Sequence, residues 1–147
     1  MRPYLQTNGR AGKKVNAMAE HPNVGLVKQG YEAFAKGDMA TLADVLDENM
    51  VWHTSGNNPL AGEYKGRDAV FKMFAQLVEL SGGTFRNEPH DILANDEHAV
   101  ALTRETARRQ GKQLDEPSIQ VYHIRDGKVT EAWSFEYDSR RYDEFWS

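Results

Sequence analysis

The sequence predicts an α+β domain in which helices gather on one face of a curved mixed sheet. Between residues 21 and 81, apolar residues recur mainly at the three- and four-residue spacing of amphipathic helices. From residue 84 onward, apolar and polar residues alternate as they do in strands. The Asp126-Gly127 pair between two such runs is a strong signal for a tight antiparallel hairpin.

Composition and charge narrow the class of protein. The chain has 147 residues, 39% of them hydrophobic and 27% charged, which suits one globular domain. Its net charge of −4 gives no basic footprint, so we expect neither a nucleic-acid nor a membrane partner. The absence of cysteine excludes disulfides and thiolate nucleophiles. No apolar run resembles a membrane span or a secretory signal, so we expect a cytoplasmic protein.

Residues 1–20 differ from the rest of the chain. They contain Arg2, Arg10, Lys13 and Lys14 but only one acidic residue, and they have few large apolar residues. We expect a flexible basic N-terminal extension there and a folded domain over residues 21–147.

Three helices are expected before residue 82. The first starts at Pro22 and ends at Gly37, and Asp38 caps the second. The third starts at residues 66–68 and ends at residues 82–83. A strand at residues 51–54 and a loop rich in glycine and proline lie between the last two helices. Strands are then expected at residues 84–94, 98–109, 118–125 and 128–137, with a loop at 110–117 and a final helical turn at 139–146.

Each later strand has a bulky face and a face of small or polar residues. Periodicity alone does not settle which face points toward the helices. If the polar faces point inward, they would line a cavity, and the bulky faces would form an exposed apolar surface. In that case we expect a twofold homodimer through the outer sheet face.

His53 is the candidate catalytic residue, because a neutral imidazole can accept a proton near neutral pH. Gln120 and Tyr31 can donate hydrogen bonds to a developing oxyanion, and Glu105 or Glu136 can orient the imidazole. Alternatively, His53 is a structural strand residue, Gln120 a surface amide and Tyr31 a core residue. The five histidines have no chelating spacing, so neither a metal nor another cofactor is expected.

The order and spacing of these elements resemble the nuclear transport factor 2-like superfamily. The similarity rests on the helix–Gly-Asp–helix–strand opening, the G-x-x-P-x-x-G loop at residues 56–62 and the four-strand finish, and it spans residues 21–146. SnoaL-like polyketide cyclases and ketosteroid isomerases are the most similar groups. The resemblance implies a cone-shaped α+β barrel, in which a strongly curved sheet packs against three helices around an apolar cavity. It also implies a homodimer.

The ketosteroid isomerase pattern implies roles for individual residues. It places His53 at the catalytic aspartate and Gln120 at the protonated aspartate of the oxyanion hole. Glu136 falls at an aromatic position that lines the pocket, and Phe74 at a supporting tyrosine. The expected substrate-binding residues are Gln120, Glu136, Glu105, Tyr31, Phe74 and Tyr122.

Three functional hypotheses follow. The first is a cofactor-independent enzyme of the isomerase or cyclase type, which moves a proton on a small apolar carbonyl or polyketide-like compound. The second is a non-catalytic module that binds a small apolar ligand on the same fold. In the third, side chains fill the pocket and only the dimer surface matters.

Overall fold

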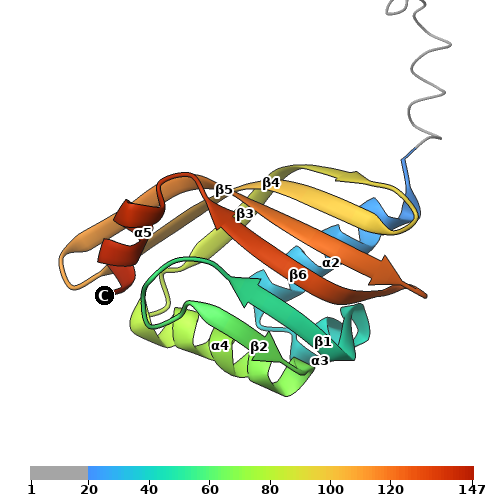
Figure 1. Ribbon diagram of the computed structural model, residues 1–147, viewed down its shortest axis with the longest axis horizontal. Coiled ribbons are helices and arrows are strands. Elements are labelled where there is room, and N and C mark those ends of the chain that lie inside the picture. The colour runs from blue at the N-terminus through green and yellow to red at the C-terminus, as the bar shows by residue number, and fades with distance from the viewer. Residues whose placement is uncertain (1–19) are drawn as a thin grey trace, which may run out of the picture.

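The computed structural model describes residues 20–147, and the predicted extension at residues 1–20 lies almost wholly outside that range. Within it, a curved six-stranded sheet lies over helices α2, α3 and α4, while α5 lies at one end (Figure 1). The helices are α2 (Pro22–Lys36), α3 (Met39–Val45), α4 (Arg67–Leu80) and α5 (Ser139–Trp146). The strands are β1 (Leu46–Thr54), β2 (Gly62–Lys65), β3 (Arg86–Ala94), β4 (His98–Arg109), β5 (Lys112–Arg125) and β6 (Lys128–Glu136).

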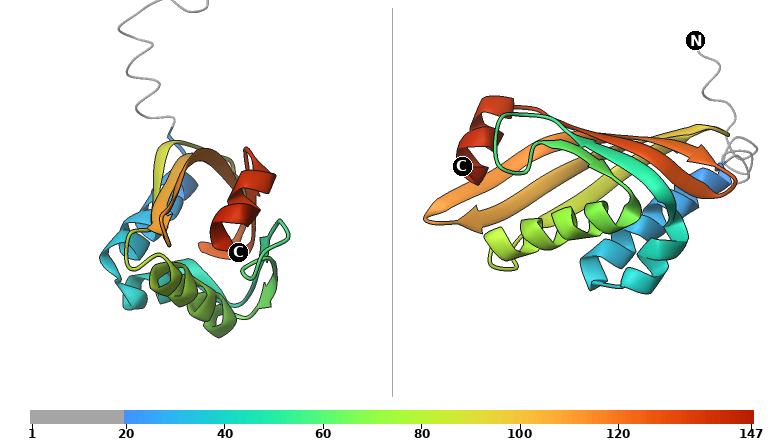
Figure 2. Two further views of the ribbon diagram at one scale, coloured as in Figure 1. Left: turned by 90° about the vertical axis from the view of Figure 1, so that its left-hand side faces the viewer. Right: turned by 60° about the horizontal axis from the view of Figure 1, so that its bottom comes forward.

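The sheet is mixed and remains open. Its strand order is β2-β1-β6-β5-β4-β3, and β1 and β6 form the parallel pair while the other neighbours run antiparallel. Figure 2 shows the strands curving over the helices, which cover the concave face. This arrangement confirms the α+β class and the curved mixed sheet. It positions a core between the concave face of the sheet and the three helices.

Local signals in the sequence account for the helix ends. The side chain of Asp38 accepts a hydrogen bond from the backbone N–H of Thr41 at 3.1 Å and so caps α3. Gly37 adopts a left-handed conformation with φ of 70°, which ends α2. No helix in residues 20–147 is long and apolar enough to span a membrane.

Two boundaries differ from the expectations. The predicted loop at 110–117 is replaced by a two-residue turn, and β5 begins at Lys112. Gln110 and Gly111 both have positive φ, 52° and 78°, which fits a tight hairpin turn and lets the strands pair immediately. The loop after β1 contains the short strand β2, which pairs antiparallel with β1.

The small and polar faces of the late strands point toward the helices. Thr103, Glu105, Ser118 and Gln120 are all buried on that side. The bulky residues lie on the opposite side, which we call the outer apolar face; its members are Val100, Leu102, Ile119, Val121, Trp133 and Phe135. Of these, Ile119 is 40% exposed and Phe135 is 48% exposed. The later strands therefore place their polar faces inside the domain, a point that periodicity alone did not settle.

The loop after β1 holds α5 in place. The carboxylate of Asp143 accepts hydrogen bonds from the backbone N–H of Asn57 at 2.9 Å and from the side-chain amide of Asn58 at 2.7 Å. A Cβ at Gly56 would lie 2.5 Å from the same carboxylate, and Gly56 has a φ of 110°. Only glycine therefore fits there without strain.

We predict that Gly56→Ala destabilises the protein by about 1–3 kcal/mol, because both the backbone strain and the contact with Asp143 are unfavourable. Gly25→Ala is the matched control. Gly25 lies in α2 with open space around its Cβ position, so alanine should stabilise the fold by about 0.5–1 kcal/mol. Urea unfolding of both variants measures the difference. A Gly56→Ala protein as stable as the parent would contradict this account of the loop.

Candidate functional site

A cavity of about 80 Å³ lies between the concave face of the sheet and helices α2, α3 and α4. Its wall is mostly apolar and aromatic. Its polar members are few and come from the sheet, from Tyr31 in α2 and from Tyr142 in α5. The lining residues used below are Tyr31, Phe34, Trp52, Thr54, Phe74, Phe85, Asn87, Glu105, Tyr122, Ser134 and Tyr142.

A chain of hydrogen bonds runs along the polar side of this cavity. The Tyr122 hydroxyl donates to the Tyr31 hydroxyl at 2.6 Å, and Tyr31 donates to Oε1 of Gln120 at 2.5 Å. The amide nitrogen of Gln120 donates to the Ser118 hydroxyl at 3.1 Å. Ser118 in turn donates to Oε2 of Glu105 at 2.8 Å. The chain thus connects two tyrosine hydroxyls to a buried carboxyl group.

Glu105 is the carboxyl group in the cavity wall. It is only 2% exposed, and its second oxygen accepts a hydrogen bond from the Tyr142 hydroxyl at 3.1 Å. Burial raises the pKa of Glu105, while the hydrogen bonds from Ser118, Glu136 and Tyr142 oppose that rise. Burial and the neighbouring Glu105 charge also raise the pKa of Tyr142.

Glu136 forms a carboxyl pair with Glu105. Both carboxylate oxygens of Glu136 are shielded from solvent, and no donor group of residues 20–147 binds them. Burial, followed by the charge of Glu105, raises the pKa of Glu136 to about 10. Glu136 therefore keeps its proton at neutral pH, and the pair carries one negative charge instead of two, because two like charges in close contact are unfavourable.

Six of the seven predicted site residues are grouped around this cavity. Tyr31, Phe74, Glu105 and Tyr122 line it, Gln120 bonds to Tyr31, and Glu136 adjoins Glu105. Phe74 packs edge-to-face against Trp52, with ring centroids 5.3 Å apart. The structure brings these side chains together; their role in binding a substrate stays a prediction.

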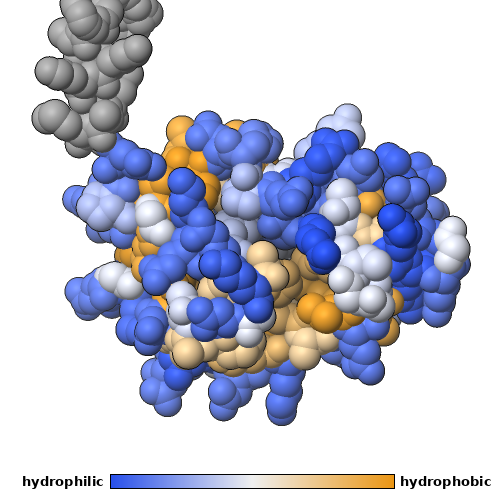
Figure 3. Space-filling model, turned by 180° about the vertical axis from the view of Figure 1, so that it is seen from behind, coloured by the Kyte–Doolittle hydropathy of each residue, from blue (hydrophilic) through white to orange (hydrophobic). Residues whose placement is uncertain are grey.

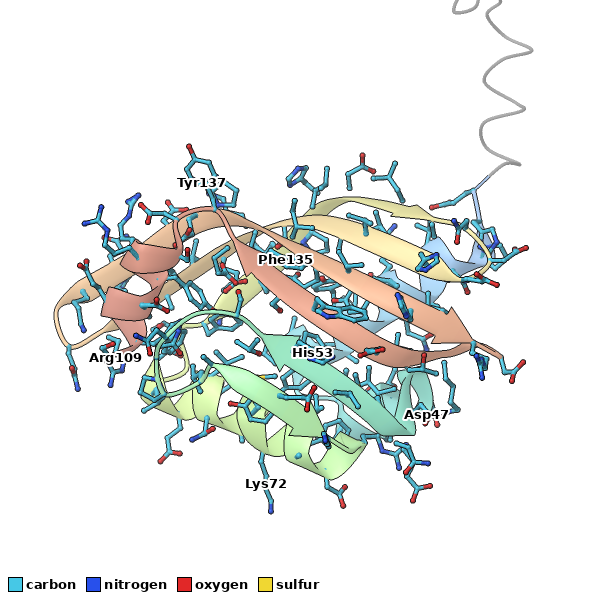
Figure 4. All side chains as sticks on the ribbon, viewed as in Figure 1. Asp47, His53, Lys72, Arg109, Phe135 and Tyr137 are labelled. Atoms are coloured by element: carbon cyan, nitrogen blue, oxygen red, sulfur yellow. The ribbon has the colours of Figure 1, made fainter. Side chains whose placement is uncertain are left out.

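His53 is the exception, and its predicted position in the cavity is wrong. Figure 4 labels His53 on β1, and its ring stacks on Trp133 of the outer apolar face with centroids 5.0 Å apart. Its Nε2 lies 2.6 Å from a carboxylate oxygen of Glu131, and its Nδ1 lies 3.3 Å from Glu63. Side chains alternate along a strand, and the neighbours Trp52 and Thr54 line the cavity. His53 must therefore point to the other side of the sheet.

The sequence did not predict two residues of this site. Tyr142 was expected only to pack in a last helical turn, yet its hydroxyl binds Glu105. Asn87 donates its amide to Oε1 of Gln120 at 3.1 Å and lines the cavity. No local signal marks Asn87, because its position depends on how β3 pairs with β4. Within residues 20–147, no group of three His, Cys, Asp or Glu side chains is placed to hold a metal ion.

The carboxyl pair predicts how stability depends on pH. Because the pKa of Glu136 is higher in the folded chain, the folded chain keeps a proton that the unfolded chain releases between the ordinary value of 4.5 and about 10. The free energy of unfolding therefore falls as pH rises through that window, by up to ~1.4 kcal/mol per pH unit. Glu136→Gln should remove most of this slope.

Denaturant unfolding of the parent and of Glu136→Gln at pH 5 to 9 measures the effect. Glu79→Gln, an exposed carboxyl in α4, carries the same charge change and should keep the parental slope. If the free energy of unfolding changed with pH in the same way in the parent and in Glu136→Gln, the claim that Glu136 keeps a proton would be contradicted.

Comparison with known proteins identifies the family. The model of the SnoaL-like domain matches residues 27–132 of this chain. Bal32a, from a soil-derived mobile gene cassette, is similar in structure with a TM-score of 0.83 and 39% sequence identity; the match covers 85% of this chain and 96% of Bal32a.

More distant structures share the fold. TerC, whose structure was determined with polyporic acid, matches with a TM-score of 0.75 and 18% identity over 85% of this chain and 98% of its own. IdmH from Streptomyces antibioticus, a proposed polyketide cyclase, matches with a TM-score of 0.66 and 16% identity over 80% of this chain and 93% of its own. The family model covers most of the chain, and the curved sheet with its enclosed cavity agrees with it, so this protein belongs to the SnoaL-like domain family.

Proposed function

We propose that the cavity binds a small, largely apolar carbonyl or polyketide-like compound and that Glu105 moves a proton on it without a cofactor. The observation that carries this proposal is the position of Glu105. Among the residues that the structure describes, it is the one carboxyl group lining a cavity whose wall is otherwise mostly apolar. Fold neighbours such as TerC with polyporic acid and IdmH support a small ligand of this general type.

The carboxyl pair supplies both a base and an acid. Glu105 accepts a proton from carbon next to a carbonyl group, and its raised pKa makes it a stronger base than an exposed glutamate. Glu136 holds the single proton of the resting pair and can return a proton to the substrate through Glu105. Two carboxyl groups whose surroundings separate their pKa values are suited to such paired roles.

The tyrosines supply donors for the developing oxyanion. The Tyr122 hydroxyl donates to Tyr31 and can donate to a ligand oxygen instead. Burial raises the pKa of Tyr31 and of Tyr122, so both hydroxyls keep their protons at neutral pH. The bond from Tyr31 to Gln120 holds the Tyr31 hydroxyl at the polar side of the cavity.

We predict that the protein accelerates exchange of the α-proton of enolisable aryl ketones in deuterated buffer. Glu105→Gln should lower that rate by about 10²–10⁴, the usual contribution of a general base. His53→Gln is the matched control, since it changes a titratable side chain on the opposite face of the same sheet. Proton NMR follows the exchange, and circular dichroism confirms folding.

The outcomes separate the hypotheses. Loss of exchange in His53→Gln with normal exchange in Glu105→Gln would contradict the proposal. Ketone binding without exchange in the parent would instead favour the non-catalytic binding module.

We also propose a twofold homodimer through the outer apolar face. Its residues form two rows across β4, β5 and β6, because Leu102, Ile119 and Phe135 pair in one row of the ladder and Val100, Val121 and Trp133 in another. Phe135 and the 80%-exposed Tyr137 are labelled in Figure 4. On the side opposite the view of Figure 1, apolar areas lie among polar residues (Figure 3). A continuous apolar patch on a sheet is typical of an interface.

Sedimentation at micromolar concentration tests this proposal. The parent should sediment as a dimer, and Phe135→Glu as a monomer, because a charge on this face opposes its burial. Met39→Glu changes an apolar side chain that is 43% exposed on α3 and should leave the dimer intact. A monomeric parent protein would contradict the proposal.

A further inference from the structure

The cavity holds acidic groups and, within residues 20–147, no basic one. Glu105 is in its wall, and Glu136 lies beside Glu105. Glu116, which is 2% exposed, pairs directly with Glu105 across β4 and β5. None of these three carboxyl groups forms an ion pair with a described Lys, Arg or His side chain. The polar end of the cavity is thus a buried acidic cluster whose carboxyl groups form no close ion pair, although the charge of Arg141 opposes the rise in the pKa of Glu116.

A buried charge is costly unless it is paired. Protonation of Glu136 removes one charge from the cluster, and the hydrogen bonds from Ser118 and Tyr142 stabilise the ionised form of Glu105. The remaining charge on Glu105 faces a cavity that a ligand can enter. A cationic ligand would therefore be attracted at this end, while an anionic ligand would be repelled.

The aromatic residues of the lining are suited to a cation as well. Seven aromatic rings line the cavity, and the faces of such rings carry the negative part of the quadrupole. Trp52, the strongest partner for a cation among them, packs edge-to-face against Phe74 and Tyr122 with centroids 5.3 and 6.0 Å away. The seven are Tyr31, Phe34, Trp52, Phe74, Phe85, Tyr122 and Tyr142.

An unused acceptor gives an independent indication. Oδ1 of Asn87 is buried and has no donor among residues 20–147, although its side-chain nitrogen is bonded to Gln120. Asn87 lines the same cavity as Glu105. A buried acceptor without a partner is unfavourable, and a ligand N–H would supply the missing donor.

We propose that the ligand of this cavity carries an ammonium group on an apolar body, with the ammonium donating to Glu105 and to Oδ1 of Asn87. The inference rests on the proposed function only in that both use the same cavity. The apolar body contacts the aromatic rings and the helices. A second hollow of about 280 Å³ shares Phe34, Phe85 and Asn87 with the cavity, and Lys36 and Arg86 also line it.

Three single-ring probes of similar size test the inference at pH 7: benzylamine, benzyl alcohol and benzoate. NMR titration of the full chain should show benzylamine binding at least about tenfold more tightly than benzyl alcohol, since one desolvated charge contact is worth ~1.4 kcal/mol or more. Benzoate should bind most weakly. Glu105→Gln should abolish the preference for the amine and leave the affinity for benzyl alcohol nearly unchanged.

Glu79→Gln, with the same change of charge on the surface, should keep the preference. Benzylamine binding no better than benzyl alcohol, failing to bind, or keeping its advantage in Glu105→Gln would overturn the inference. Ketone exchange that depends on Glu105 without a preference for the amine would leave the proposed proton transfer intact. A preference for the amine without ketone exchange would support the ammonium ligand and contradict the proposed proton transfer.

Discussion

The structure depends on one constraint: most of the polar side chains on the concave face of the sheet must form hydrogen bonds with one another, because the helices cover that face. Thr103, Ser118 and Gln120 are buried there, and their hydrogen bonds converge on Glu105. Leaving any of these groups without a partner would cost about 1–3 kcal/mol. The network therefore fixes the positions of the tyrosines from α2 and α5, and with them the shape of the cavity.

The two faces of the sheet carry different kinds of side chain and have different roles. The concave face carries small and polar side chains, which leave space for a ligand and hold a proton between two carboxyl groups. The outer apolar face carries the bulk that would fill an ordinary core. The loop after β1 also contributes to the cavity. It holds α5 through Asp143, and α5 supplies Tyr142 to the cavity wall.

Much of this arrangement could be predicted from the sequence. Helix starts and ends followed from local chemistry at Pro22, Gly37 and Asp38, and strand alternation separated the two faces of β4, β5 and β6. The same alternation grouped Glu105 with Ser118 and Gln120. His53 was expected in the cavity because the spacing of the ketosteroid isomerase pattern places the catalytic residue there. Side chains alternate along β1, however, and Trp52 points inward, so His53 points outward. Asn87 and Tyr142 could not be foreseen, because their places depend on pairing and packing between distant segments.

The central claim is that Glu105 and Glu136 share one proton inside the cavity. Carbon-13 NMR of the glutamate carboxyl groups, assigned by comparison with Glu105→Gln and Glu136→Gln, measures this directly during a pH titration. The account predicts that one carboxyl group of the pair remains protonated at pH 7 and loses its proton only at alkaline pH, near the value of about 10 for Glu136. Ionisation of both groups near pH 4.5, the ordinary value for glutamate, would contradict it.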